Sequence, residues 1–139
     1  MSALGDRLAI IMMLSGTWDA IAKMEDLLPR LEERLHLSIT SSRTTPVRAR
    51  QALMPYAIDV VSFDQISVVH DITKFIANNN INIQALYTNS YNALHTGTPM
   101  MSLHMTINIP TDVSIAALRG DFMDFCDQLN LDAIMEPVK

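Results

Sequence analysis

The sequence has little of what secreted, membrane-spanning or DNA-binding proteins usually contain. Its single cysteine, Cys126, excludes a disulfide framework within one chain. No apolar run approaches the roughly 18 residues that a membrane-spanning helix needs, and no signal-peptide pattern is found at the N-terminus. Basic residues number 10 against 15 acidic ones, and the net charge of −5 opposes direct binding to nucleic acid. We therefore expect a cytoplasmic protein without a direct contact to DNA or to a membrane.

Apolar residues are plentiful instead. They make up 49% of the 139 residues, which is too much for a disordered chain. A chain of this length can bury a core in one or two small domains. The question is how the apolar residues are spaced.

The clearest pattern begins at Pro55. Tyr56, Ile58 and Val60 alternate with less apolar neighbours, which predicts a strand. From Gln65 the spacing becomes three or four residues, which predicts the apolar face of a helix. The members of that face are Ile66, Val69, Ile72 or Thr73, and Ile76, and it is widened by Val68 and Phe75. Three asparagines, 78–80, are predicted to end the helix, and a second strand follows from Ile81.

The remainder of the chain continues this arrangement. Tyr87–Pro99 is predicted to be a polar loop at a hairpin tip, followed by an alternating strand from Met101 to Ile109. A turn at 110–112 introduces a helix that ends at Asn130, and Leu131–Val138 is the final strand. Residues 55–139 therefore predict an α+β, ferredoxin-like βαββαβ domain.

The N-terminal part predicts only the second half of such a domain. Leu8–Leu14 is a continuous apolar run, typical of a strand covered on both faces. A helix follows from Trp18 to Leu35, with Pro29 expected to kink it or to start a second helix. Short strands are expected at Ser2–Leu4 and Leu37–Thr40. The predicted boundaries are a partial domain at 1–45, a linker at 46–54 and a complete domain at 55–139.

The linker region is polar and carries Arg48 and Arg50, with Arg43 just before it. These charges suit a flexible connector, and a contact with nucleic acid or with an acidic partner is the alternative.

The sequence LAIIMMLSGTWDAI at 8–21 and the SSRTT stretch at 41–45 resemble the glycine cleavage repressor family of tandem ACT-domain proteins. Residues 55–139 resemble the second ACT domain of that family. The resemblance implies that 1–45 is an ACT domain without its first strand and first helix. Because the first strand of this fold lies between the third and fourth, we hypothesise that a strand from the second domain or from another copy fills the slot.

The resemblance also implies a function. Members of the family are understood to be non-enzymatic repressors that bind a LysR-type transcriptional activator, with glycine as the signal. ACT domains generally hold an amino acid between the first strand–helix turn and a neighbouring domain, so a homo-oligomer is expected. The positions carried over as ligand-binding residues are Ser62, Phe63, Asp64, Gln65 and Asn82. Ile66 and Ser67 stand where ligand-binding members commonly have Pro-Gly, so the turn departs from the family pattern.

No catalytic residue, metal or cofactor is predicted. The four histidines, His36, His70, His95 and His104, fit no metal-binding spacing. Two other readings stay open. One is an oligomeric ACT scaffold without a ligand. The other is a small enzyme of the acylphosphatase kind, which Asp64 disfavours because a carboxylate in the turn repels a phosphate.

Overall fold

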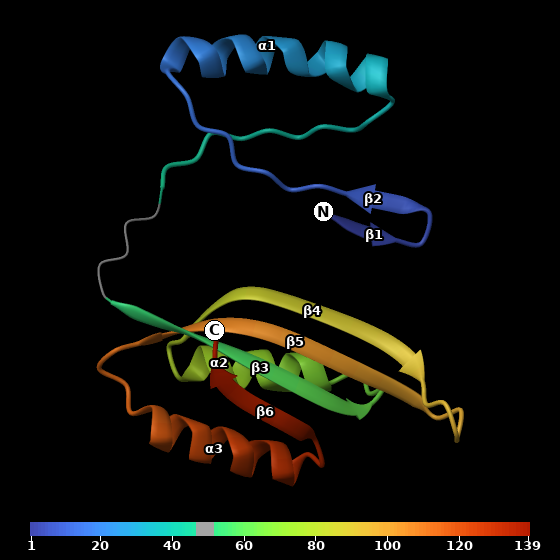
Figure 1. Cartoon of the computed structure of the whole chain (residues 1–139), viewed down its shortest axis with the longest axis vertical. Helices are drawn as coiled ribbons and strands as arrows, with labels where there is room; N and C mark the ends of the chain where they lie inside the picture. The colour runs from blue at the N-terminus through green and yellow to red at the C-terminus, as the bar shows by residue number, and fades with distance from the viewer. Residues whose placement is uncertain (47–51) are drawn as a thin grey trace. The chain divides into compact units, whose positions relative to one another are not determined.

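The computed structural model describes residues 1–46 and 52–139, which form two compact units, Met1–Val47 and Arg48–Lys139 (Figure 1). Arg48 and Arg50 of the predicted linker lie outside the described residues. The other end of that predicted linker, Leu53 and Met54, lies in the first strand of the second unit. We refer to the two parts as unit 1 and unit 2.

Unit 2 has the predicted order of elements. The six elements are β3 (Leu53–Phe63), α2 (Val68–Asn78), β4 (Asn82–Asn92), β5 (Pro99–Pro110), α3 (Ile115–Gln128) and β6 (Asp132–Pro137). The sheet has the order β4-β5-β3-β6 with every pair antiparallel. The first strand thus lies between the third and the fourth, which confirms the ferredoxin-like fold. Both helices cover one face of the sheet (Figure 1).

The core of unit 2 fills the space between this face and the two helices. Tyr56, Ile58 and Val60 of β3 are buried, and their neighbours point to the uncovered face. Phe122 of α3 is fully buried, with its ring centroid 5.6 Å from that of Phe75 on α2. Apolar residues recur every second residue in the strands and about every 3.6 residues in the helices. Both sets face the same space, so they form one continuous apolar layer.

The start of α2 differs from the prediction. The helix begins at Val68, and its buried residues are Val68, Ile72 and Ile76. Ile66 is fully exposed in the turn before the helix, so its assignment to the apolar face is wrong. Because the helix begins three residues after Gln65, Ile66 lies before its first turn. The buried face therefore starts at Val68 and continues through Ile72 and Ile76 as predicted.

The predicted polar loop at Tyr87–Pro99 is also wrong for most of its length. β4 continues to Asn92 and β5 begins at Pro99, so that only the short segment between them turns. Every residue from Tyr87 to Asn92 is exposed, which explains why no apolar alternation marks the strand. Backbone pairing with β5, as far as Asn92 opposite Pro99, holds this arm in place of burial.

Unit 1 contains a hairpin of β1 (Ser2–Leu4) and β2 (Arg7–Ala9), followed by α1 (Trp18–Leu35). The Thr17 hydroxyl caps α1 by accepting a hydrogen bond from the backbone N–H of Ala20. Pro29 lies inside α1 and starts no second helix. Its ring is exposed, and the proline removes the backbone hydrogen bond that an N–H at this position would donate to the carbonyl of Glu25.

The two longer strands predicted for unit 1 are not formed. The strand stops at Ala9, Ile10–Leu14 has no regular structure, and Leu37–Thr40 is likewise no strand. The expectation that Leu8–Leu14 is covered on both faces is wrong, since its apolar side chains are more than half exposed. None of residues 1–46 is buried. These segments have the composition of core strands, but no strand of the described residues pairs with them.

Candidate functional site

The turn between β3 and α2 holds four of the five predicted ligand-binding residues. Ser62 is buried at the end of β3, and its hydroxyl donates a hydrogen bond to the carbonyl oxygen of Phe63 at 2.9 Å. The Phe63 side chain is more than half exposed. Ser62 therefore shapes the backbone of the turn, and Phe63 offers an apolar surface beside it.

Asp64 and Gln65 form the exposed part of this turn. The Asp64 backbone N–H donates to the carbonyl oxygen of Pro99 at 3.1 Å, which ties the turn to the start of β5. The Gln65 carbonyl accepts from the Val68 N–H at 3.5 Å, the first bond at the start of α2. The Asp64 carboxylate remains at the surface, where it can attract a cation such as an ammonium group.

The first turn of α2 supplies the complementary charge. Ser67 precedes the helix and forms no side-chain capping bond there. Backbone N–H groups at a helix N-terminus carry partial positive charge and bind carboxylates or phosphates. The first turn also contains the carboxylate of Asp71, so its positive element is the backbone N–H groups alone. Asp64 and these N–H groups could face the two charges of an amino acid zwitterion.

Asn82 does not lie beside this turn. Asn82 pairs with Asn108 of β5, which in turn pairs with Pro55 near the beginning of β3. Phe63 lies eight residues further along β3, or about 26 Å at the usual rise per residue. The two parts of the predicted site are therefore at opposite ends of the sheet within one copy of unit 2.

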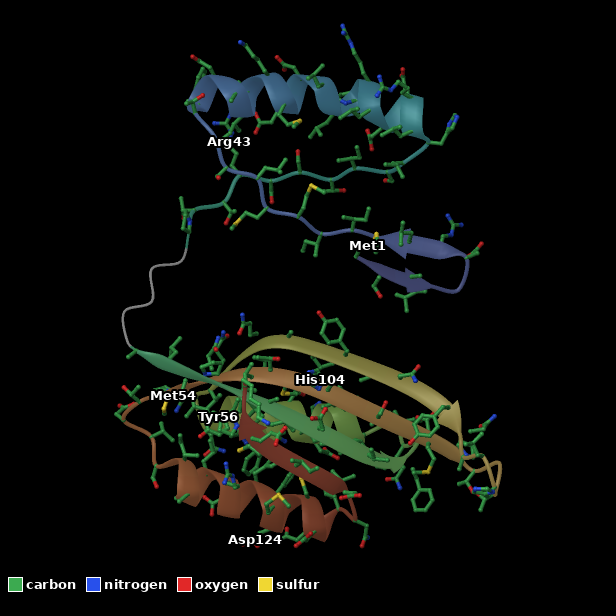
Figure 2. All side chains as sticks on the ribbon, in the orientation of Figure 1. Met1, Arg43, Met54, Tyr56, His104 and Asp124 are labelled. Carbon is green, nitrogen blue, oxygen red and sulfur yellow. The ribbon has the colours of Figure 1, made fainter. Side chains whose placement is uncertain are left out.

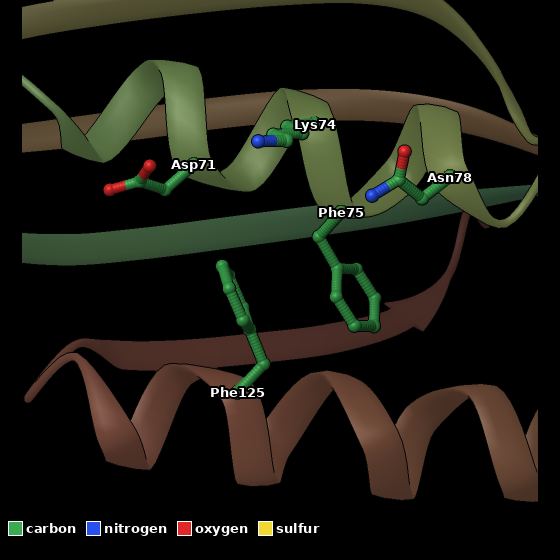
Figure 3. Close-up of a pocket in the computed structure, with 5 residues that line it drawn as sticks. All are labelled: Asp71, Lys74, Phe75, Asn78 and Phe125. Carbon is green, nitrogen blue, oxygen red and sulfur yellow. The ribbon is translucent and has the colours of Figure 1, made fainter.

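A cavity opens elsewhere, between the outer faces of α2 and α3 (Figure 3). It has a volume of about 390 Å³, and Phe75 and Phe125 stack in it with ring centroids 4.9 Å apart. The polar lining residues are Asp71, Lys74 and Asn78 from α2. None of the predicted ligand-binding residues lines it. A variant in this cavity can therefore serve as a control for a variant in the turn between β3 and α2.

One exposed pair was not predicted from the sequence. His104 Nδ1 lies 2.5 Å from Asp59 Oδ1 on the uncovered face of the sheet. Figure 2 labels His104 together with Tyr56, which is buried on the other face. The alternation of β3 and β5 places both Asp59 and His104 on the outer face, but only the register shows that they are neighbours. The carboxylate of Asp59 orients the imidazole of His104.

Two other kinds of site were considered, a reactive cysteine and a metal site. Cys126 is buried in α3, and burial, with a smaller contribution from the charge of Asp127, raises the pKa of its thiol to about 11. Cys126 is therefore a small core residue. Among the described residues, no cluster of three His, Cys, Asp or Glu side chains has the geometry for a metal ion.

The fold of unit 2 has counterparts among solved structures. An antiparallel β4-β5-β3-β6 sheet with two helices on one face is the ferredoxin-like arrangement of ACT domains. A solved ACT domain protein from Streptococcus pneumoniae matches 60% of this chain and 89% of its own with a TM-score of 0.51 and 20% identity. We found no family model that matches the chain.

The chain also resembles the glycine cleavage system transcriptional repressors, as the sequence predicted. It is 27% identical to the repressor of Escherichia coli strain K12 over 132 residues, 94% of this chain and 68% of the relative. A solved structure of a proposed glycine cleavage system transcriptional repressor matches 89% of this chain and 69% of its own, with a TM-score of 0.68 and 18% identity. The chain spans a smaller share, 55%, of a solved protein from Galdieria sulphuraria.

None of the helices described in the two units has the length and apolar character of a membrane span.

Proposed function

We propose that this chain is an amino-acid-responsive regulatory protein of the glycine cleavage repressor type. The main support is the similarity to the Escherichia coli repressor, which extends over 94% of the chain. In this proposal the protein is cytoplasmic, has no enzymatic activity and controls transcription by binding a LysR-type activator protein. The net charge of −5 supports a protein partner over DNA, because DNA binding usually requires a basic face.

The proposed effector is glycine, bound at the turn between β3 and α2. Its carboxylate is placed at the N-terminal N–H groups of α2, and its ammonium group beside the Asp64 carboxylate. Ser62 and Gln65 fix the backbone of the turn, and Phe63 shields one side. Ile66 is exposed next to this turn, so its side chain does not fill the space where the ligand would lie.

In the same proposal, the Asn82 that contacts the ligand comes from a neighbouring domain. Since Asn82 and the turn lie at opposite ends of one sheet, a ligand that contacts both must lie between two domains. Binding would then favour the assembly in which the domains meet, and this population shift is the proposed signal to the partner protein.

Calorimetric titration with glycine and a panel of other amino acids tests the ligand. We expect heat with glycine, and its loss in Asp64→Ala. The matched control is Lys74→Ala, which removes a charge from the cavity between α2 and α3 and should bind as the wild type does. Loss of binding in the control alone would move the site to that cavity. No heat with any amino acid favours the alternative of an oligomeric scaffold without a ligand.

The partner is tested separately. The chain should co-sediment with the LysR-type activator of a glycine cleavage operon, and glycine should change the bound fraction. It should not retard operator DNA when the activator is left out. Turnover of an acyl phosphate would instead support the acylphosphatase-like alternative.

A further inference from the structure

The cavity between α2 and α3 takes no part in the proposed glycine site, yet it has the size of a ligand site. Its volume of about 390 Å³ lies within the range of roughly 300–1,000 Å³ that small-molecule sites occupy. One of its walls is fixed by the core, since the ring of Phe75 also packs against the fully buried Phe122 at a centroid distance of 5.6 Å. The cavity is formed within unit 2 alone.

Two aromatic rings form the apolar wall of this cavity. Phe75 of α2 and Phe125 of α3 lie with their ring centroids 4.9 Å apart and their planes inclined by 26° (Figure 3). Both side chains are only partly buried. Aromatic rings favour offset stacks and edge-to-face pairs with centroids about 4.5–7 Å apart, so the exposed side of this pair can take a third ring. The apolar part of a ligand should therefore be flat and aromatic.

Three polar side chains of α2 line the cavity beside these rings. Asp71, Lys74 and Asn78 are three or four residues apart and follow one side of the helix (Figure 3). In the described parts of the chain, none of the three side chains forms a hydrogen bond or an ion pair. Thr73 and Asn79 of the same helical region differ, because their side chains donate to backbone carbonyls of α2. The polar groups at the cavity are therefore available to a ligand.

The two charges restrict the ligand further. A molecule with a carboxylate alone would be attracted by Lys74 and repelled by Asp71, and a molecule with an ammonium group alone would meet the reverse. A molecule with both groups can pair each of them with its opposite. Asp71 and Lys74 are about 4.5 Å apart along the helix axis, at roughly 1.5 Å per residue, which suits the neighbouring charges of a small zwitterion.

We propose that this cavity binds a small aromatic zwitterion. Its ammonium group lies at the Asp71 carboxylate, its carboxylate at the Lys74 ammonium group, and its ring against Phe75 and Phe125. The Asn78 amide, one turn beyond Lys74, can donate to or accept from a polar substituent on the ring. Glycine carries the same two charges without a ring, so it lacks the contact that holds a ligand in this cavity.

This second site is independent of the proposed function. The proposed glycine site is at the turn between β3 and α2, and none of its residues lines the cavity. A chain that fails to bind glycine can still bind an aromatic zwitterion, and the reverse also holds. The two sites are therefore tested with different ligands.

Calorimetric titration of the full chain with L-phenylalanine tests the proposal. Three related molecules each lack one group of this probe: 3-phenylpropionate lacks the ammonium group, phenethylamine the carboxylate and glycine the ring. We expect L-phenylalanine to bind. In competition against it, each of the other three should bind at least ~10-fold more weakly, because a charged contact or the ring contact is lost.

Substitutions in the cavity locate the site. Lys74→Ala and Asp71→Asn should each weaken the binding of L-phenylalanine at least ~10-fold. The matched control is Arg119→Ala, which removes an exposed charge of α3 outside the cavity and should leave the binding unchanged. In nuclear magnetic resonance spectra, L-phenylalanine should shift the backbone amide signals of Phe75 and Phe125. Far-ultraviolet circular dichroism establishes that each variant is folded.

The absence of L-phenylalanine binding would overturn the proposal. So would binding that survives both Lys74→Ala and Asp71→Asn, or signal shifts confined to the turn between β3 and α2, since the ligand would then lie elsewhere. Competition by 3-phenylpropionate or phenethylamine as strong as that of L-phenylalanine itself would overturn the pairing of both charges.

Discussion

At the scale of single residues, Glu25 and Arg43 form the one two-pronged ion pair among the described residues. Glu25 is a charged residue on the otherwise apolar stripe of α1. Both of its carboxylate oxygens accept hydrogen bonds from the Arg43 guanidinium at 2.8 Å. The same guanidinium lies 5.9 Å from the centre of the Trp18 ring. Arg43 therefore fastens the segment that leaves unit 1 to two points on α1, in addition to any contact with a partner.

The hydrogen bonds from Arg43 lower the pKa of Glu25. The pair is therefore intact at neutral pH and is lost as the pH falls through the lowered pKa of Glu25. In Arg43→Ala we expect that pKa to rise toward its ordinary value, measured by nuclear magnetic resonance titration of the Glu25 carboxyl carbon. Arg43→Lys, which keeps the charge without the two-pronged hydrogen bond, should give an intermediate pKa. An unchanged pKa in Arg43→Ala would contradict the contact.

Cys126 should react slowly with thiol reagents. Its thiol is buried and, with a pKa of about 11, is protonated at neutral pH, whereas thiolate is the reactive form. We expect alkylation by iodoacetamide at neutral pH to be slow in the folded protein and to become fast in concentrated urea. Mass spectrometry over time measures both rates. Fast alkylation of the native protein would mean that α3 opens readily.

At the scale of elements, two glycines offer a comparison. Gly120 lies inside α3 and Gly97 in the turn between β4 and β5, and an added Cβ meets nothing within 4 Å at either. They differ in backbone conformation, since Gly97 has a φ of +67°. Gly120→Ala should stabilise unit 2 by about 0.5–1 kcal/mol, because alanine loses less conformational entropy in a helix. Gly97→Ala should destabilise it by about 1 kcal/mol through the left-handed conformation. Urea unfolding curves measure both, and equal effects would contradict this explanation.

The sequence predicted those elements whose order and burial are local properties. The alternation in β3 and β5 and the asparagines that end α2 and α3 required only neighbouring residues. Asn80 and Asn130 indeed have φ values of 56° and 55°, the left-handed conformation expected at helix ends. The outer half of β4 could not be predicted, because backbone pairing alone holds it and its side chains carry no pattern.

The candidate site was harder to predict than the elements, because part of it depends on how strands pair. The turn residues are contiguous, so their proximity follows from the sequence. The position of Asn82 relative to them depends on how β4 pairs with β5, which no local pattern reveals. The Asp59–His104 contact, between residues on two different strands, likewise required the register.

At the scale of the whole molecule, the two units differ in what stabilises them. All the buried side chains of the described residues belong to unit 2, and unit 1 has none. A fragment of residues 48–139 should therefore unfold cooperatively, with a midpoint within a few degrees of the matching transition in the full chain. A fragment of residues 1–47 should show no cooperative transition when dilute. Thermal unfolding followed by circular dichroism measures both, and a cooperative dilute fragment 1–47 would contradict this division.

The central position of β3 has a consequence for biosynthesis. A ribosome releases β3 before either of its hydrogen-bonding neighbours, β5 and β6, has been translated. The nascent chain therefore carries the apolar side chains of Ile58 and Val60 on a strand whose two edges are both open. Only when the last strand, which ends at Pro137, has left the exit tunnel can the sheet close around it. Maturation of unit 2 is thus delayed until β6 has emerged, and a ribosome stalled before that point would hold the chain in an aggregation-prone form.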